Sequence, residues 1–281
     1  MNPRVTLREK LHEVRDRKTA LLAANFYNAE TLRGVLEAAA DLRQPIILQL
    51  TRSSIDYLGL PVAFAMGRAA IQHYGVEAWI HLDHAISLDL VEACLEAGFD
   101  SVMIDASEKD LAQNIATTRK AVAMARRTGA NVEAELGFVA KLGQEANPAG
   151  MTDPEAAARF VQETGIDALA VSIGTAHGFY SATPSLDMDR LSAIHSLTDI
   201  PLVLHGGSGV GEAAIREVVA RGICKVNVAT ETKDAFVKGV KREIQSTTDI
   251  DLRNIFPPAI RDVRELIKQK LRMFMAESGR V

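Results

Sequence analysis

The segment Glu77-Ala78-Trp79-Ile80-His81-Leu82-Asp83-His84 passes from an apolar, strand-like run to two imidazoles and a carboxylate. Two further histidines occupy comparable places, since His177 follows the apolar run that ends at Ile173 and His205 follows Leu202-Val203-Leu204. Imidazole is the commonest metal ligand in proteins, and a neighbouring carboxylate can transfer protons. The segment therefore predicts a buried strand that presents chemically active side chains at its end.

Short aliphatic runs alternate with helical patterns on both sides of this segment. Strands are predicted at 21–25, 46–50, 78–82, 101–104, 131–135, 168–173, 201–204 and 223–226. Helices are predicted at 6–17, 30–42, 61–74, 88–97, 111–128, 154–164, 187–196 and 211–221. The segment beyond about residue 231 is predicted to form further helices that are broken at Pro257-Pro258. Eight βα units in about 250 residues predict an α/β fold with a parallel sheet, closed as a TIM (β/α)8 barrel with extra C-terminal helices. A doubly wound open sheet is the alternative.

Polar residues at the strand ends favour the closed barrel. Each predicted βα unit supplies at least one polar residue at or just after the end of its strand. These residues are Asn25, Thr51, Asp83, His84, Asp105, Glu135, His177 (on the loop after the sixth strand), His205 and Asn227. In a barrel, the carboxyl ends of all eight strands converge on the face that carries the active site. We therefore expect these side chains to lie close together.

The composition limits the class of protein. The 281 residues are 47% hydrophobic and 24% charged with a net charge of −4, which is typical of a globular chain. No basic patch indicates nucleic acid, and no apolar run reaches the ~18 residues of a membrane span. Cys94 and Cys224 lack metal-binding spacing and are expected to be buried free thiols. We expect one domain spanning residues 1–281 in the cytoplasm.

The three histidines predict one metal site. A lone histidine is more often structural, but neutral imidazoles at three strand ends of one face suit zinc with an open fourth position. Asp83 is interpreted as a catalytic acid/base, and a solvated charge or helix cap is its alternative. Asp105 and Glu135 are expected to orient a ligand or to hold a second cation, unless basic neighbours neutralise them. His81 is expected to be structural.

The last two strands end in residues that suit an anion. Glycines let backbone N–H groups converge on a phosphate, and hydroxyl groups add donors. Barrels often carry a phosphate site at this position. The residues concerned are Gly206, Gly207, Ser208, Asn227, Val228, Ala229 and Thr230. A metal beside a phosphate site predicts a small phosphorylated substrate with a group to polarise.

With these residues assembled, nearly the whole chain resembles the class II, zinc-dependent ketose-bisphosphate aldolases. The resemblance is carried by the motifs at 81–84, 132–137, 174–178, 205–209 and 225–231. Ala229 stands where the fructose-bisphosphate branch tends to have an acidic residue, so the tagatose-bisphosphate branch is the more similar one.

The resemblance implies reversible cleavage of a phosphorylated ketose to dihydroxyacetone phosphate and an aldehyde. His84, His177 and His205 would hold one zinc ion, and Asp83 would move the hydroxyl proton. Gly178 and the residues after the last two strands would bind the phosphate end, with a monovalent cation nearby. It further implies a homodimer or homotetramer.

Two expectations concern the remainder of the substrate. The resemblance implies Glu145 as the base for the carbon-bound proton, although the loop is short and Ala146 replaces the usual aspartate. Asn25, Thr51 and Arg52 are candidate substrate contacts, with a plain surface charge as the alternative for Arg52.

The sequence leaves the aldehyde open, including a non-standard ketose 1-phosphate as substrate. A non-catalytic sugar-phosphate-binding accessory subunit and a zinc barrel hydrolase or epimerase are the alternative functions.

Overall fold

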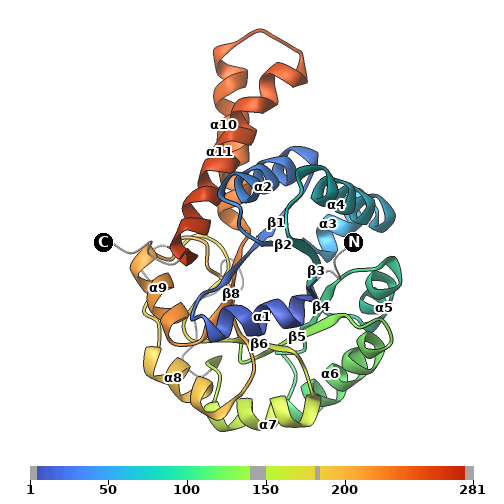
Figure 1. The fold of residues 1–281 in the computed structure, drawn as a ribbon, viewed down its shortest axis with the longest axis vertical. Helices are drawn as coiled ribbons and strands as arrows, with labels where there is room; N and C mark the ends of the chain where they lie inside the picture. The colour runs from blue at the N-terminus through green and yellow to red at the C-terminus, as the bar shows by residue number, and fades with distance from the viewer. Residues whose placement is uncertain (1–4, 140–149, 181–183, 276–281) are drawn as a thin grey trace.

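Parallel strands arranged as a closed barrel form the centre of the protein. The computed structural model describes residues 5–139, 150–180 and 184–275. The barrel strands are β1 (Leu21–Asn25), β2 (Ile46–Thr51), β3 (Ala78–Ala85), β4 (Ser101–Ile104), β5 (Asn131–Leu136), β6 (Ala168–Val171), β7 (Leu202–Leu204) and β8 (Ile223–Val228). They pair in chain order, and β8 pairs with β1 in the register Leu22 with Val226 (Figure 1). This closure confirms the predicted TIM barrel and excludes the open sheet.

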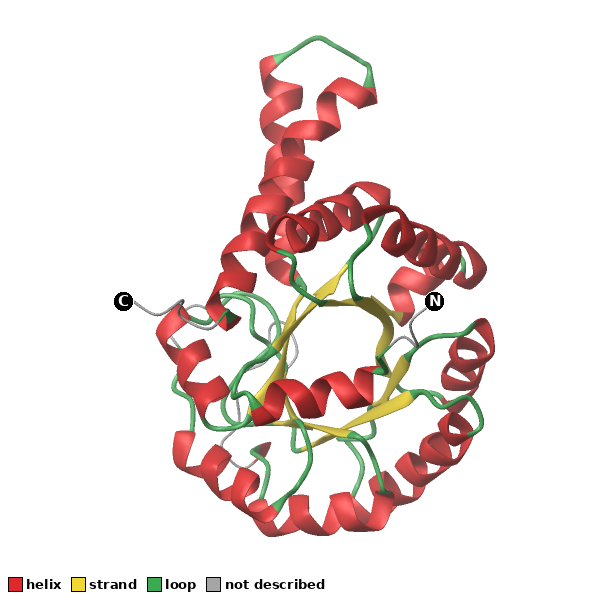
Figure 2. Ribbon diagram, viewed as in Figure 1, coloured by secondary structure: helices red, strands yellow, loops and turns green. Residues whose placement is uncertain are grey.

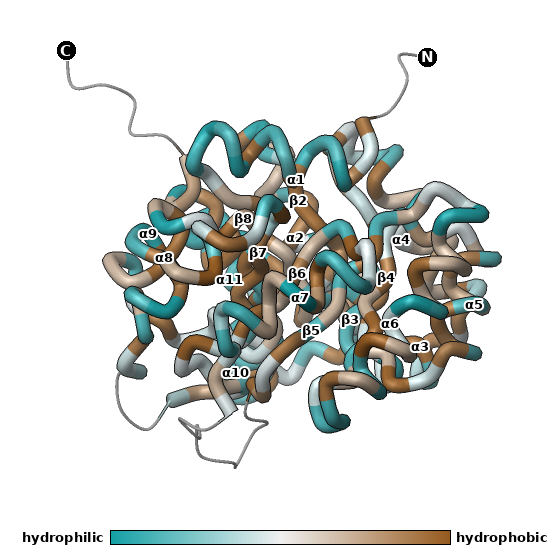
Figure 3. Tube along the Cα trace, turned by 90° about the horizontal axis from the view of Figure 1, so that it is seen from below, coloured by the Kyte–Doolittle hydropathy of each residue, from teal (hydrophilic) through white to brown (hydrophobic). Residues whose placement is uncertain are grey.

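The helices form a ring outside the barrel (Figure 2). They are α2 (Ala29–Leu42), α3 (Arg52–Leu58), α4 (Leu60–Tyr74), α5 (Leu88–Ala97), α6 (Leu111–Arg126), α7 (Pro154–Thr164), α8 (Met188–Leu197) and α9 (Glu212–Ala220). Apolar residues concentrate on the strands and hydrophilic turns lie on the outside (Figure 3). No helix within the described ranges is both long and apolar enough to cross a bilayer. Cys94 and Cys224 are buried free thiols, as expected.

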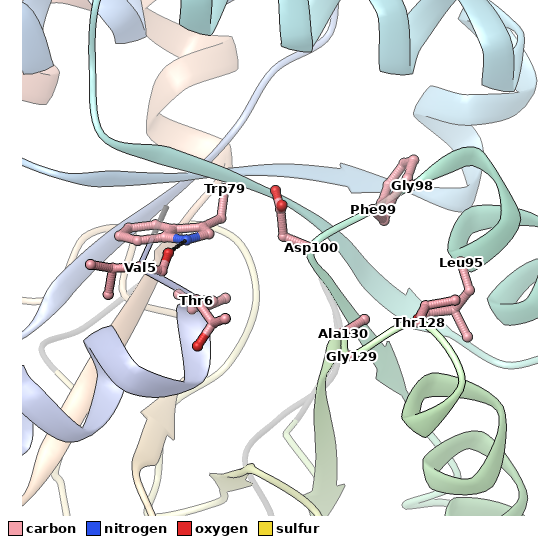
Figure 4. A pocket seen from close by; sticks show the side chains of 11 residues that line it. Val5, Thr6, Trp79, Leu95, Gly98, Phe99, Asp100, Thr128, Gly129 and Ala130 are labelled. Atoms are coloured by element: carbon pink, nitrogen blue, oxygen red, sulfur yellow. Dashed lines mark hydrogen bonds between the residues drawn. The ribbon is translucent and has the colours of Figure 1, made fainter. Parts of the chain in front are cut away.

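The first helix, α1 (Leu7–Asp16), lies across the amino-terminal end of the barrel (Figure 1). Its apolar residues Leu7, Leu11 and Val14 form one buried cluster with side chains that include Trp79 of β3. The indole Nε1 of Trp79 donates to the carbonyl oxygen of Val5 at 3.0 Å. A cavity of about 250 Å³ lies beside this contact (Figure 4). α1 therefore covers this end of the barrel, and the carboxyl ends of the strands lie at the other end.

The two C-terminal helices project from the barrel wall as an arm beside α2 (Figure 1). They are α10 (Thr230–Ser246) and α11 (Leu252–Phe274). The predicted break at Pro257-Pro258 is wrong, since both prolines lie inside α11 and the chain turns at residues 247–251. The prolines lie near the start of α11, where Asp251 caps the helix and Ala259 packs against Gly239. Packing of α11 against α10 and α2 therefore offsets the cost of the two prolines, which cannot donate backbone hydrogen bonds.

One helix was not predicted. The short α3 begins directly after β2, and the Thr51 hydroxyl accepts from the backbone N–H of Ser54 as its N-cap. Its residues Arg52–Leu58 bury only Ser54 and Ile55, so there is little hydrophobic periodicity to indicate it.

Candidate active site

The end of β3 departs from regular strand geometry. Successive residues of a strand point to opposite faces, so Asp83 and His84 should diverge. Instead His84 has a φ of +50°, and the register with β4 shifts between Leu82 and Ala85. A positive φ is uncommon for a residue other than glycine and clusters at functional sites. The irregular backbone brings both side chains to the barrel mouth, where His84 Nε2 lies 4.0 Å from Asp83 Oδ1.

The three predicted histidines converge at this mouth. One ring nitrogen of each of His84, His177 and His205 lies within 4.8 Å of the others. The rings of His84 and His205 are the nearest pair, with Nε2 of the first 2.8 Å from Nδ1 of the second. His84, Asp105 and Glu135 form a second group that meets the same distance condition. Both groups of predicted ligands are thus assembled, and His84 belongs to both.

In His84 and His205, the outer ring nitrogen faces a carboxylate and the inner ring nitrogen faces the other histidine. The hydrogen bond of the outer nitrogen decides whether the inner nitrogen carries a hydrogen or a lone pair. Nδ1 of His84 lies 2.9 Å from Asp105 Oδ2, and Nε2 of His205 lies 2.8 Å from Glu133 Oε1. An ionised carboxylate only accepts, so both outer nitrogens carry the hydrogen. In the neutral rings, the two inner nitrogens then face each other with lone pairs at 2.8 Å. Such an arrangement requires a cation or a shared proton between them.

The pKa values are consistent with one positive charge at this point. Burial opposes protonation of His84, but the charges of Asp83 and Asp105 outweigh it and raise the pKa to about 9. Burial and the neighbouring imidazoles lower the pKa of His177 to about 3 and also lower that of His205. The three rings therefore accommodate one positive charge between them.

Asp83 is held as an ionised acceptor. Burial opposes its charge, but the electrostatic effects of His84 and His205 are stronger and lower its pKa. Its two carboxylate oxygens accept from Asn25 Nδ2 at 3.2 Å and from Asn227 Nδ2 at 3.4 Å. Two neutral amides therefore orient the carboxylate without neutralising it, which suits a group that accepts a proton.

The two other acidic residues differ in charge state. Asp105 accepts from the backbone and hydroxyl of Ser107 and contacts His84, and these bonds depress its pKa despite burial. Burial and the charge of Asp105 raise the pKa of Glu135 to about 8. Among the described residues, Glu135 Oε2 has no hydrogen-bond partner. A buried carboxyl oxygen without a partner fits a position beside a cation, whose charge would favour the ionised form of Glu135.

The loops after β6, β7 and β8 are tied together beside the histidines. The hydroxyl of Tyr180 accepts from the N–H of Ala176 at 2.9 Å and donates to the carbonyl of Gly206 at 2.7 Å. The N–H of Gly207 donates to the carbonyl of Asn227 at 3.1 Å, and that of Ala229 to Ser208 Oγ at 3.4 Å. The residues predicted for the phosphate are thus neighbours, and they lie at the N-terminus of α10, which begins at Thr230. The side chain of Val228 is buried, so this residue can contribute only its backbone.

Four predicted residues are not placed in direct contact with the histidine cluster. Arg52 is on α3 with its side chain 58% exposed, and its Nε is 3.3 Å from Asp56 Oδ2. Thr51 serves as the cap of α3, and Asn25 reaches the site through Asp83. Glu145 lies outside the described residues.

Sequence reasoning missed Glu133 and Lys225, which are fully buried beneath His205. Lys225 Nζ lies 2.7 Å from Glu133 Oε2. A signal was present, because each is a charged residue inside a short apolar strand. His81 is also buried, 3.2 Å from Lys225 Nζ, in keeping with a structural role.

A closed (β/α)8 barrel with a histidine and carboxylate cluster at the carboxyl ends of its strands defines a TIM-barrel enzyme. The sequence profile described as fructose-bisphosphate aldolase class-II matches residues 5–279. The chain belongs to this family, and it is an aldolase, a carbon–carbon lyase.

Solved structures are similar over almost the full length. The YdjI aldolase from Escherichia coli K12 is 30% identical with a TM-score of 0.87, and the match covers 98% of each chain. A protein from Coccidioides immitis, provisionally assigned as a fructose-1,6-biphosphate aldolase, is 28% identical with a TM-score of 0.84 over 94% of each chain. Fructose-bisphosphate aldolase from Campylobacter jejuni, at 22% identity, has a TM-score of 0.81 over 96% of this chain and 95% of its own, which supports the fold.

Proposed function

We propose that the protein is a zinc-dependent aldolase that reversibly cleaves a phosphorylated ketose to dihydroxyacetone phosphate and an aldehyde. His84, His177 and His205 would hold the zinc ion. The observation that carries this assignment is the pair of inner ring nitrogens, 2.8 Å apart, whose outer partners are carboxylates. Three neutral imidazoles with an open fourth position are a donor set typical of catalytic zinc.

Bound zinc would supply a Lewis acid that polarises the ketose carbonyl group. Asp83 is ionised and takes the proton from the hydroxyl group that becomes the aldehyde, as the neighbouring carbon–carbon bond breaks. In the condensation direction Asp83 returns this proton. Asn25 and Asn227 hold its carboxylate in place in both directions. Glu145 is proposed as the base for the carbon-bound proton.

The dihydroxyacetone phosphate end is proposed to bind at Gly178, Gly206 to Ser208 and Asn227 to Thr230. Helix N-termini attract phosphate because their first N–H groups lack helical partners and the helix dipole is positive there. α10 begins at this point, and among the described residues no side chain caps it. A monovalent cation nearby would balance further phosphate charge. Asp105 and Glu135, with His84, are proposed as an alternative divalent position.

The far end of the substrate remains a choice between two classes. A tagatose- or fructose-1,6-bisphosphate-like ketose requires a second phosphate contact, for which Arg52 is the candidate. Arg52 is paired with Asp56 on the same helix, but both side chains are mostly exposed, so this pair is weak and Arg52 can exchange it for a phosphate. The alternative is a non-standard ketose 1-phosphate without a second phosphate group, and the panel of aldehydes described below distinguishes the two classes. We further propose that the enzyme assembles as a homodimer or homotetramer.

The test combines metal analysis with product analysis. The purified protein is incubated with dihydroxyacetone phosphate and a panel of phosphorylated and unphosphorylated aldehydes, before and after chelation. We expect bound zinc, condensation products that disappear on chelation, and loss of both in His84→Ala. The matched control is His73→Ala, an exposed histidine on α4. Unchanged cleavage by metal-free His84→Ala protein would contradict the proposal.

A further inference from the structure

A layer of buried polar side chains lies inside the barrel directly beneath His205. Lys225, His81 and Ser101 are 0% exposed and Glu133 is 1% exposed. Lys225 Nζ lies 2.7 Å from Glu133 Oε2 and 3.2 Å from His81 Nε2. His81 Nδ1 lies 2.7 Å from the Ser101 hydroxyl. An ion pair buried to this extent is costly to remove from water, so stability alone does not explain its presence.

The direction of these hydrogen bonds follows from their chemistry. An ammonium group can only donate, so His81 Nε2 accepts from Lys225 and His81 Nδ1 donates to Ser101. Glu133 is ionised and can only accept, because the ammonium group of Lys225 lies 2.7 Å from its Oε2 and both side chains are buried. One oxygen of Glu133 accepts from Lys225 and the other from Nε2 of His205.

Glu133 therefore fixes both the tautomer and the orientation of His205. With its hydrogen on Nε2, the lone pair of His205 lies on Nδ1, which points toward His84 Nε2 at 2.8 Å. Lys225 in turn holds Glu133 from the opposite side and balances its charge. Without Lys225, the carboxylate would be uncompensated in the barrel interior and free to turn away from the imidazole.

We propose that Glu133 and Lys225 are positioning residues that preset His205 as an Nδ1 ligand and thereby set the affinity for the metal. This inference rests on the proposed zinc site. Carboxylate partners of metal-bound histidines typically contribute about 10–100-fold in affinity. Neither residue needs to touch the substrate.

The test separates positioning from a purely structural role. We compare the wild type with Glu133→Gln, Lys225→Met and the double variant that combines them. Each protein is stripped of metal, and two quantities are measured: stability in urea, and affinity for Zn²⁺ and Co²⁺ in competition with a chromophoric chelator. The Co²⁺ absorption spectrum reports the ligand geometry.

Each single variant should be less stable, because it leaves one buried charge unpaired. The double variant contains no unpaired charge and should recover stability, yet it should still bind metal at least about tenfold more weakly than the wild type, with an altered Co²⁺ spectrum. Lys10→Met is the matched control. Lys10 is 13% exposed and paired with Glu13 and Glu77 on the opposite end of the barrel, so its loss should leave metal affinity unchanged.

Glu133→Asp extends the test if the double variant does not fold. It keeps the charge beside Lys225 but withdraws the carboxylate by one methylene, so it should weaken metal binding likewise. If the double variant and Glu133→Asp both bind metal with wild-type affinity and give the wild-type Co²⁺ spectrum, this inference is overturned while the proposed function stands. A wild-type protein that binds no metal would refute the proposed function and this inference with it.

Discussion

Replacement of Gly206 by alanine should damage the fold and the site together. Gly206 follows His205 directly and has a φ of +68°, a conformation that side-chain-bearing residues rarely adopt. A Cβ atom at this position would overlap the carbonyl oxygen of Ala176 and lie 2.8 Å from its carbonyl carbon. Both atoms are backbone, so they cannot rotate away.

The cost has two parts. The left-handed conformation costs about 1–2 kcal/mol for a residue with a Cβ. Forcing an extra carbon into a packed region costs about 1–3 kcal/mol more. The sum of about 2–5 kcal/mol should lower the melting temperature by on the order of 10 °C. Relaxation would separate the backbone of Ala176 from Gly206 and thus move His177 away from His205.

The assay is thermal and urea unfolding of the metal-free protein, together with a zinc titration. We expect a destabilised variant whose zinc affinity falls at least about tenfold, since two proposed ligands are displaced. Gly211→Ala is the control, because its φ is −65° and a Cβ there meets no described atom within 4 Å. A Gly206→Ala protein within 1 kcal/mol of the wild type, roughly the cost of the torsion alone, would refute the reasoning.

Three further predictions concern single side chains. Asp83→Asn should retain zinc but lose about 10²–10⁴-fold in cleavage rate, and a rate within threefold of wild type would remove Asp83 from the proton transfer. The stability of the metal-free protein should fall as the pH drops from 6.5. Burial is the main cause that lowers the pKa of His81 to about 3 in the folded protein. Below pH 6.5 the unfolded chain therefore binds a proton at His81 that the folded protein does not bind. His81→Gln should reduce this slope by about 1.4 kcal/mol per pH unit in urea titrations between pH 6 and 5, and an unchanged slope would contradict the burial argument. Tyr180→Phe removes a hydroxyl that bridges two loops, so it should lower stability by about 1–2 kcal/mol and weaken zinc binding, whereas an effect on neither quantity would show that the loops hold without it.

Much of the fold could be predicted from local pattern. Aliphatic runs punctuated by Gly98, Gly129 and Gly165 mark strand and helix ends, because these glycines adopt a positive φ that closes the helices or the turns after them. The polar residues at the strand ends favoured a closed barrel, and the pairing of β1 with β8 confirms it. Pro257 and Pro258 misled the prediction, since burial of α11 against α2 outweighs a local helix-breaking preference.

The site was predictable by residue type but not by geometry. The sequence indicates that His84, His177 and His205 share a face, because parallel strands end together. It does not indicate the positive φ of His84, which coincides with the register shift between β3 and β4. Nor could Glu133 be matched with Lys225, because the two residues are 92 positions apart and meet only when the barrel closes.

The irregular backbone at the end of β3 couples the orientations of the neighbouring side chains of Asp83 and His84. One backbone torsion aims both the proposed proton acceptor Asp83 and the proposed zinc ligand His84, so neither can be re-aimed without moving the other. An engineer who wishes to change the metal preference at His84 should expect proton transfer to change as well. Substrate preference is accordingly easier to change in the loops that follow the other strands. Such changes leave the positions of Asp83 and His84 unaltered.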